Sequence, residues 1–252
     1  MRKYLMLMMA LVGLIAVSVA GIASAAGGGP VTAEAGNIKF TVDGDFSPSK
    51  LPKKKLAPIV LSTSGKIQTK DGTHPPALKT VEVETDKNGT INTKGVPACT
   101  SGKLQSRDTK AAEKVCKSAI IGTGTTNVEI QFPEQNPIPV SSKLLVFNGG
   151  TSGGKTTLFI HAYITVPTPA AIVTTVKIKK IHKGRYGLLS VASIPKIAGG
   201  SGSVTSFSLK VGNKKKVLSA KCPDGKLQAH ANAIFADGTK VSAGIIRTCT
   251  GT

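Results

Sequence analysis

His161 and Tyr163 are the two residues of this chain whose types and spacing best suit proton-transfer chemistry. They stand two apart in a stretch with strand-like alternation, so their side chains project from one face. A histidine and a tyrosine placed together can take and give a proton, the chemistry that glycan lyases on β-sandwich folds use. A pair packed in a sheet with its polar atoms satisfied fits the same spacing and is more common. We therefore expect the packed pair and keep the lyase as an alternative hypothesis.

The other histidines and the serines form no stronger catalytic pattern. No two of His74, His161 and His230 have the spacing of zinc ligands. The serines include no Gly-x-Ser-x-Gly turn of the kind that carries a nucleophile. We therefore expect no metal and no cofactor, and we favour a protein without enzymatic activity.

The acidic residues have a structural interpretation. Glu82 and Glu84 lie on one face of a predicted strand and could form a glycosidase-like pair. We interpret them instead as a solvated face that partly neutralises nearby lysines. Four further acids stand beside glycines, where aspartate commonly supports a turn. These predicted turn acids are Asp43, Asp45, Asp224 and Asp237.

Positive charge is the strongest physical feature of the sequence. The chain has 33 Lys and Arg residues against 13 Asp and Glu, a formal charge of +20 at pH 7. Such a surface attracts and steers anions, most strongly at low salt. We expect anionic cell-wall polymers or lipid headgroups as partners, although a basic surface also serves solubility alone. The candidate anion-binding residues are Lys53, Lys54, Lys55, Lys177, Lys179, Lys180, Lys183, Arg185, Lys214, Lys215 and Lys216.

The composition argues against two other classes of ligand. The chain has no Trp, and aromatic residues make up 4% of it, so few rings are present for base stacking or for a neutral-sugar platform. Lysine also far outnumbers arginine, which leaves few bidentate contacts. We expect no sequence-specific nucleic-acid recognition; extracellular nucleic acid would be bound through its phosphates.

The amino terminus has the three parts of a secretory signal peptide. Basic Arg2 and Lys3 precede an apolar run from Tyr4 to Ala20, and Ala23-Ser24-Ala25 is a small-residue cleavage site. We predict a cleaved signal peptide over residues 1–25. An uncleaved anchor is the alternative, because the apolar run is near the length that spans a bilayer.

With this signal peptide, we expect the mature protein to be secreted or extracytoplasmic, and it could be associated with the cell wall. Residues 26–36 are mostly small, and we predict a flexible leader there. No later stretch is long and apolar enough to cross a membrane, and no long linker divides the chain. We predict a single β-sandwich domain over 37–252. Because the signal peptide holds two cations and no acid, the mature part keeps a charge of +18.

Four cysteines lie in the mature part, at Cys99, Cys116, Cys222 and Cys249, and they allow three pairings. Their spacing lacks the Cys-x-x-Cys pattern of zinc sites, and export places them in an oxidising space. We therefore predict disulfides and favour local pairing, Cys99 with Cys116 and Cys222 with Cys249. Each such bond is worth roughly 3 kcal/mol.

Short alternating stretches separated by Gly, Pro, Asp and Asn predict antiparallel strands and tight turns. In 174–181 the apolar residues face one way and the lysines the other. Asn88-Gly89 and Asp237-Gly238 are predicted hairpin turns. The predicted strands are Ile38–Val42, Ile59–Ser64, Thr80–Glu84, Val128–Phe132, Lys143–Phe147, Thr156–Val166, Ala171–Ile181, Tyr186–Ser193, Val204–Val211, Lys216–Ala220, Gln228–Phe235 and Lys240–Arg247.

One short helix is predicted over Thr109–Cys116. Asp108 can cap it, and Ala111 and Val115 share a face at i, i+4 spacing. Cys116 would then join the helix to the loop that carries Cys99.

Several short motifs follow one another along the chain. They are Asp71-Gly72-Thr73-His74-Pro75-Pro76, Gly95-Val96-Pro97-Ala98-Cys99, Phe147-Asn148-Gly149, Ile194-Pro195 and Cys222-Pro223-Asp224-Gly225. This order resembles a group of uncharacterised secreted proteins of high-GC Gram-positive bacteria. The resemblance spans nearly all of residues 37–250. It implies a secreted β-rich protein and carries over no catalytic residue.

These inferences predict an all-β protein, an antiparallel β-sandwich with a jelly roll as one candidate topology, one short helix and two local disulfides. Our leading functional hypothesis is a secreted or wall-associated structural or binding protein whose basic face holds anionic envelope polymers. The alternatives are the glycan lyase with His161 and Tyr163, and a self-associating adhesin or surface-layer subunit. The sequence predicts no oligomeric state.

Overall fold

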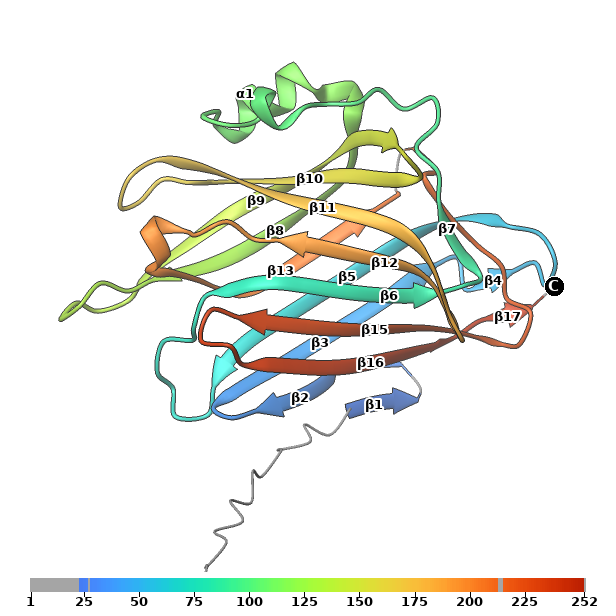
Figure 1. Cartoon of the computed structure of the whole chain (residues 1–252), viewed down its shortest axis with the longest axis horizontal. Helices are drawn as coiled ribbons and strands as arrows, with labels where there is room; N and C mark the ends of the chain where they lie inside the picture. Colours follow the sequence, from blue (N-terminus) through green and yellow to red (C-terminus); the bar gives the residue numbers. More distant parts are fainter. Residues whose placement is uncertain (1–22, 27, 213–214, 252) are drawn as a thin grey trace, which may run out of the picture.

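The computed structural model describes residues 23–26, 28–212 and 215–251 (Figure 1). The strands are β1 (Ala23–Ala26), β2 (Val31–Ala35), β3 (Ile38–Ser47), β4 (Lys50–Leu51), β5 (Ala57–Thr69), β6 (Leu78–Asp86), β7 (Gly89–Ile91), β8 (Ile120–Ile130), β9 (Ile138–Ser152), β10 (Lys155–Ile164), β11 (Ala170–Lys183), β12 (Tyr186–Ser193), β13 (Gly202–Val211), β14 (Leu218–Ala220), β15 (Lys226–Phe235), β16 (Lys240–Thr248) and β17 (Thr250–Gly251). The helices are α1 (Thr109–Val115) and three 3-10 turns at Ser101–Lys103, Lys117–Ala119 and Ala198–Gly200. The predicted all-β class is confirmed, and each of the twelve predicted strands has a counterpart.

Fifteen of these strands form one sheet, in the order β1-β16-β15-β6-β12-β11-β10-β9-β8-β13-β5, with β14 and β7 continuing from part of β5 and with β3 and β2 continuing from the rest of it. Strands β8 to β12 are neighbours in chain order, whereas β6 lies between β12 and β15. All pairs in this sheet are antiparallel except β1 with β16. Because β2 also lies against β16, the sheet curls until it nearly closes into a barrel-like sandwich (Figure 1).

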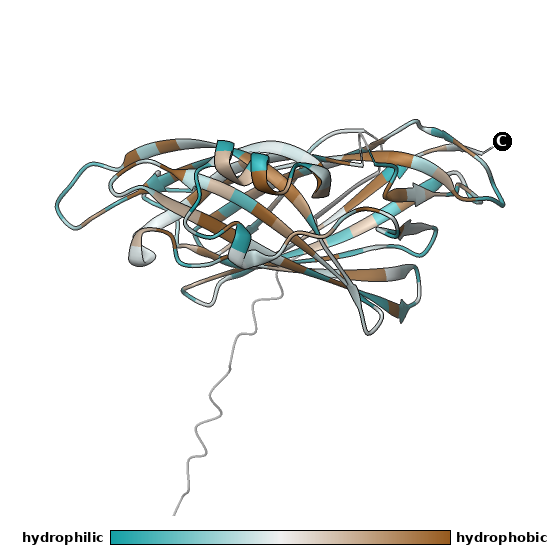
Figure 2. Cartoon of the chain, turned by 90° about the horizontal axis from the view of Figure 1, so that it is seen from above, coloured by the Kyte–Doolittle hydropathy of each residue, from teal (hydrophilic) through white to brown (hydrophobic). Residues whose placement is uncertain are grey.

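The main core forms where the two ends of the curled sheet meet. Phe40 and Ile67 from β3 and β5 pack with Phe235 and Val241 from β15 and β16, and all four are buried. Burial of each such side chain contributes about 1.5–3 kcal/mol relative to exposure. In Figure 2 the hydrophobic colour lies mainly along the strands, while the loops at both ends are hydrophilic. The core therefore holds the sandwich together and leaves its two ends to polar loops.

Strand β11 shows the predicted alternation. Val176 and Ile178 are buried, while Lys177 and Lys179 point outward. The two buried residues belong to an apolar cluster that includes Leu158 of β10. The predicted inside and outside of this strand are confirmed, because side chains alternate between faces along a strand.

Helix α1 covers the outer face of the sheet beside β9 and β10 (Figure 1). The Asp108 side chain accepts a hydrogen bond of 2.8 Å from the backbone N–H of Ala111, so the predicted cap is confirmed. The face that Ala111 and Val115 share is not the buried one: Ala112 is the buried residue of the helix, and Val115 is 41% exposed. The Cys99–Cys116 disulfide holds the short helix in place, and Ala112 and Phe147 belong to the same buried apolar cluster beneath it.

The predicted flexible leader over 26–36 is wrong for its second half. Val31–Ala35 forms β2, and Val31 and Ala33 point into the main core. Small alternating residues suffice here because β3 supplies a ready hydrogen-bonding partner along the whole strand. The predicted signal peptide falls outside the described residues except for Ala23–Ala25, which belong to β1. Its cleavage stays a prediction.

The turn predicted at Asn88-Gly89 does not make a hairpin. Strand β6 pairs with β12 and β15, while β7 pairs with β14, so the chain leaves one part of the sheet and joins another. The buried Asp86 carboxylate accepts a hydrogen bond of 2.9 Å from the Asn88 N–H and fixes this corner. The hairpin at Asp237-Gly238 is confirmed between β15 and β16, with Gly238 at φ 88°.

Candidate anion-binding cleft

Lysines from four separate segments meet at one end of the sandwich. They surround a cleft of about 850 Å³ that lies among the β4–β5 loop, the β6–β7 corner, the end of β11 and the residue after β14. The lysines that line it are Lys54, Lys55, Lys87, Lys180 and Lys221. In Figure 1 this end carries the labels of β4, β7 and β17. The open end of a closed or nearly closed sheet is a common place for a ligand site.

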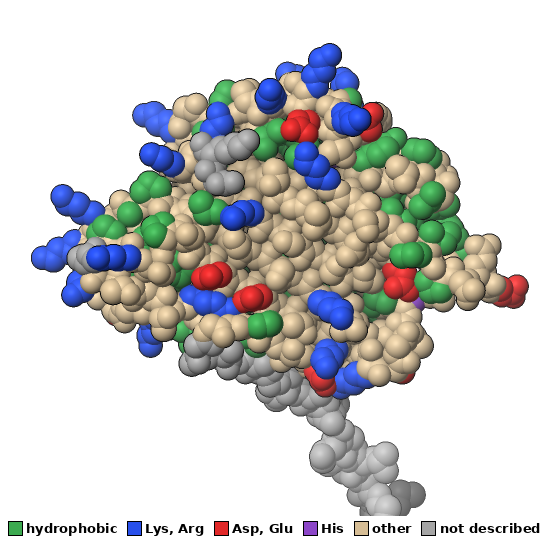
Figure 3. All heavy atoms as spheres, turned by 180° about the vertical axis from the view of Figure 1, so that it is seen from behind, with side chains coloured by type: hydrophobic (Ala, Val, Ile, Leu, Met, Phe, Trp, Pro, Cys, Tyr) green, Lys and Arg blue, Asp and Glu red, His purple; other side chains and the backbone are tan. Residues whose placement is uncertain are grey.

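The charge of the cleft is not neutralised from within. None of the residues that line it is Asp or Glu. Among the residues that the structure describes, none of the five lysines forms a salt bridge. Figure 3 shows Lys and Arg side chains gathered along the edge of the molecule that corresponds to this end. The uncompensated charges make the cleft a site of positive potential that favours anions.

Lys87 is positioned by close contact between two backbones. Its N–H donates a hydrogen bond of 2.9 Å to the Arg185 carbonyl, and its Nζ donates one of 3.4 Å to the Gly184 carbonyl. Gly187 lies directly beneath it, and a Cβ at that position would come within 2.6 Å of the Lys87 Cα. Only glycine lets the β6–β7 corner approach β12 this closely.

Lys221 and the β4–β5 loop are held by the second disulfide. The Lys221 N–H donates to the Asn88 carbonyl at 3.0 Å, and the next N–H, from Cys222, donates to the Pro52 carbonyl at 2.9 Å. Cys222 forms a disulfide with Cys249, and Leu51 belongs to the same small buried cluster as these two cysteines. Both predicted disulfide pairings are confirmed. This one anchors two of the four walls of the cleft.

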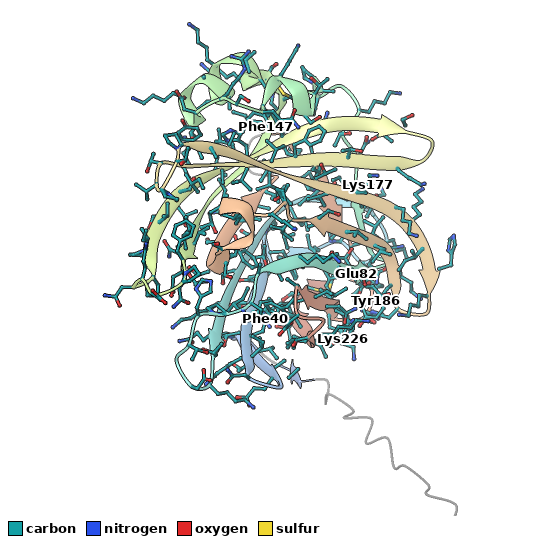
Figure 4. The ribbon with its side chains drawn as sticks, turned by 60° about the vertical axis from the view of Figure 1, so that its left-hand side comes forward. Phe40, Glu82, Phe147, Lys177, Tyr186 and Lys226 are labelled. Carbon is teal, nitrogen blue, oxygen red and sulfur yellow. A yellow bond between two sulfur atoms is a disulfide. The ribbon has the colours of Figure 1, made fainter. Side chains whose placement is uncertain are left out.

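Arg185 anchors the wall formed by the β11–β12 turn. Its Nε donates a hydrogen bond of 2.6 Å to the buried Asp86 carboxylate, and its Nη atoms donate to both oxygens of Asp224 and to the Lys226 carbonyl. These hydrogen bonds raise the pKa of Arg185 and lower the pKa of Asp224. Tyr186 and Lys226 lie near each other at this corner in Figure 4.

The structure divides the predicted basic residues. Lys54, Lys55 and Lys180 reach the cleft. Lys183 pairs with Glu84 at 2.8 Å, which raises the pKa of Lys183, and Arg185 is held by its own carboxylates. Five other candidates are exposed and do not line the cleft: Lys53, Lys177, Lys179, Lys215 and Lys216. Two of these, Lys177 and Lys179, lie on the outer face of β11, where Figure 4 labels Lys177. Lys214 lies outside the described residues.

Lys87 and Lys221 were missed by sequence reasoning. Neither lies in a run of basic residues. They meet the other lysines because β6 pairs with β12 and β14 pairs with β7, and both pairings join segments far apart in the chain. We find no pattern in the sequence that predicts such long-range pairing.

Neither residue of the predicted proton-transfer pair lines either of the two clefts described here, among the residues that the structure covers. His161 has 0% exposure, and its Nε2 lies 2.9 Å from the Arg107 carbonyl of the segment before α1. Neither it nor Tyr163 lines the basic cleft. His161 is therefore packed as expected, and the lyase hypothesis loses its main support. The expectation that its polar atoms are all satisfied is wrong, because the buried Nδ1 has no hydrogen-bond partner among the described residues.

Burial gives His161 a pH-dependent effect on stability. Burial lowers the pKa of its imidazole below the usual 6.5, although the hydrogen bond with Arg107 opposes the shift. As the pH falls below 6.5 the unfolded chain takes up the proton first, so we expect the free energy of unfolding to fall by up to about 1.4 kcal/mol per pH unit from this residue. Urea titrations at pH 7, 6 and 5 should show a shallower decline for His161→Gln. An equal decline in both proteins would contradict this assignment.

The acidic residues differ from the predicted solvated and turn positions. Glu84 is buried, beside Lys183 and with its Oε2 3.9 Å from the His230 Nδ1, so the solvated face is wrong for this residue. Asp43 pairs with Arg247 and Asp224 with Arg185, so these two acids do more than support turns. Asp237 accepts a hydrogen bond of 2.9 Å from the Thr239 N–H, as a turn acid does. Asp45 lies inside β3, opposite Ser62 of β5, so the predicted turn position is wrong for this residue.

A second cleft, of about 470 Å³, lies away from the basic residues. Its lining includes His74, Phe132 and Glu134 but no Lys or Arg. The His74 Nδ1 lies 3.5 Å from a Glu129 carboxylate oxygen, and the neighbouring Ser203 hydroxyl donates to the Pro75 carbonyl at 2.6 Å. The Ser203 hydroxyl is therefore already engaged with the backbone.

Comparison with models of protein families, with curated proteins and with solved structures found no match. Within the described part of the chain, no helix has the length and hydrophobicity that crossing a bilayer requires.

Proposed function

We propose that this chain is an extracytoplasmic binding protein that holds anionic envelope polymers at the basic end of its sandwich. The observation that carries the proposal is the cleft in which five lysines meet, none of them paired with an acidic residue in the described part of the chain. Because lysine is a compact, mobile point charge, such a site suits phosphate or carboxylate groups. Two disulfides fit an oxidising compartment.

The proposal is tested by retention on immobilised poly(glycerol phosphate). We expect binding at low salt and a steep loss between about 50 and 500 mM NaCl, since lysine–phosphate contacts release counterions. The triple variant Lys54→Gln, Lys55→Gln, Lys180→Gln should bind at least tenfold more weakly, because it removes three unpaired charges from the cleft.

A matched control carries the same change in net charge away from the cleft. Lys110, Lys114 and Lys117 are exposed on or next to α1, and replacing all three with glutamine should change the affinity by less than about threefold. Equal losses in the two triple variants would mean that net charge alone attracts the polymer. That outcome, or retention that does not depend on salt, would overturn the proposed site.

A further inference from the structure

The basic cleft also has an apolar lining. Leu188 reaches it from β12 and is packed against the buried cluster around Val176, so the lining continues into the core. Ile181 at the end of β11 also lines the cleft and is half-buried. Leu56 completes this lining and is 53% exposed, one of three large hydrophobic side chains so exposed among the described residues. An apolar surface within a ring of lysines is not required for binding a fully hydrated polymer.

The charge of the cleft indicates what kind of head group fits. Five lysines and His182 line it, and no carboxylate does. A single carboxylate carries one negative charge, whereas a phosphate monoester carries about two at neutral pH and presents three oxygens. The phosphate therefore matches several lysines at once and leaves less uncompensated charge.

We propose that the cleft binds a phosphorylated amphiphile, with its phosphate between the lysines and its hydrocarbon chain over Leu56, Ile181 and Leu188. The inference rests on the proposed function, because both use the same lysines, and it names the ligand class of that site. A volume of about 850 Å³ lies within the range of small-molecule sites. A chain that covers Leu56 removes its apolar surface from water, and each buried methylene raises affinity about fourfold.

The test compares four defined probes by isothermal titration calorimetry, all below the micelle concentration. Dodecyl phosphate should bind at least tenfold more tightly than glycerol phosphate, which has the head group without the chain, with a negative heat-capacity change. It should also bind at least tenfold more tightly than dodecanoate, and an uncharged dodecyl glycoside should show the weakest binding. The comparison separates the contributions of the head group and the chain.

Two variants assign the two parts of the ligand to residues. Leu56→Gln changes an exposed side chain, so the fold is retained, and it should weaken dodecyl phosphate at least threefold while leaving glycerol phosphate unchanged. The pair Lys54→Gln, Lys55→Gln should weaken both phosphates.

The outcomes distinguish this inference from the proposed function. Equal affinity for dodecyl phosphate and glycerol phosphate, or no effect of Leu56→Gln, would overturn the amphiphile while polymer retention persists. Equal affinity for dodecanoate would overturn the phosphate head group. Binding to anionic vesicles but not to the dispersed amphiphile would replace the cleft with a membrane-docking surface and also overturn it. Loss of binding to every anion, the polymer included, would overturn the proposed function itself.

Discussion

Replacing Arg185 with alanine is expected to lower the free energy of unfolding by about 3 kcal/mol. The guanidinium is the only cation paired with the Asp86 carboxylate among the described residues, and Asp86 is 3% exposed. Without Arg185 the carboxylate keeps hydrogen bonds only from the Asn88 and Gln228 N–H groups, of 2.9 and 3.1 Å. A buried charge left without its counter-charge costs several times what an exposed ion pair contributes.

Urea denaturation at pH 7 measures this loss. Lys143→Ala is the matched control, because its pair with Glu113 has a similar N–O distance of 3.0 Å but both side chains are about half exposed. That control should lose less than about 0.5 kcal/mol. A loss from Arg185→Ala no larger than the control would mean that the Asp86 carboxylate is not dependent on this pair. Restoring stability by combining Arg185→Met with Asp86→Asn would support the account.

Removing the Cys222–Cys249 disulfide by serine substitution is expected to cost about 3.5 kcal/mol. The bond closes a loop with a sequence separation of 27, so its loss enlarges the conformational freedom of the unfolded chain. The substitution also loosens the small cluster of Leu51 and Ala220 that supports Lys221 and the β4–β5 loop. We therefore expect polymer affinity to fall along with stability.

The Cys99–Cys116 bond is the control for this second effect. Its removal should cost about 3 kcal/mol, but the bond lies beside α1 and supports no wall of the cleft. Retention on poly(glycerol phosphate), measured at a temperature where both variants remain folded, should weaken only for the Cys222–Cys249 variant. Equal retention by both would separate the disulfide from the binding site.

Local features of the fold could be predicted from the sequence. Alternation in stretches such as 174–181 reveals which residues face the core, because the period of a strand is two. The cap at Asp108 and the local pairing of the cysteines depend on residues that are close along the chain. These elements need no knowledge of the partner strands.

Features that depend on distant segments could not be predicted. Asn88-Gly89 has the residues of a hairpin turn. However, β12 and β15 occupy the two edges of β6, so β7 pairs with β14 instead. The segment 26–36 has mostly small residues and therefore predicts no strand. Pairing with β3 nevertheless makes Val31–Ala35 a strand, and Val31 and Ala33 pack in the main core. The cleft follows from the same cause, since Lys87 and Lys221 approach Lys180 only through the order of strands in the sheet.

The place of β6 in the sheet has a consequence for how the chain folds. Residues 78–86 hydrogen-bond to strands that begin at residues 186 and 226, so both neighbours of β6 are made more than 90 residues after it. Closing loops of this length precedes any gain from the pairing, and folds rich in such contacts form slowly. Strand β6 therefore stays without either neighbour until β12 and β15 exist, whereas β2, β3 and β5 pair with one another close along the chain. During synthesis both edges of β6 therefore stay unpaired for longer than those of β9 or β10, whose neighbours follow in chain order.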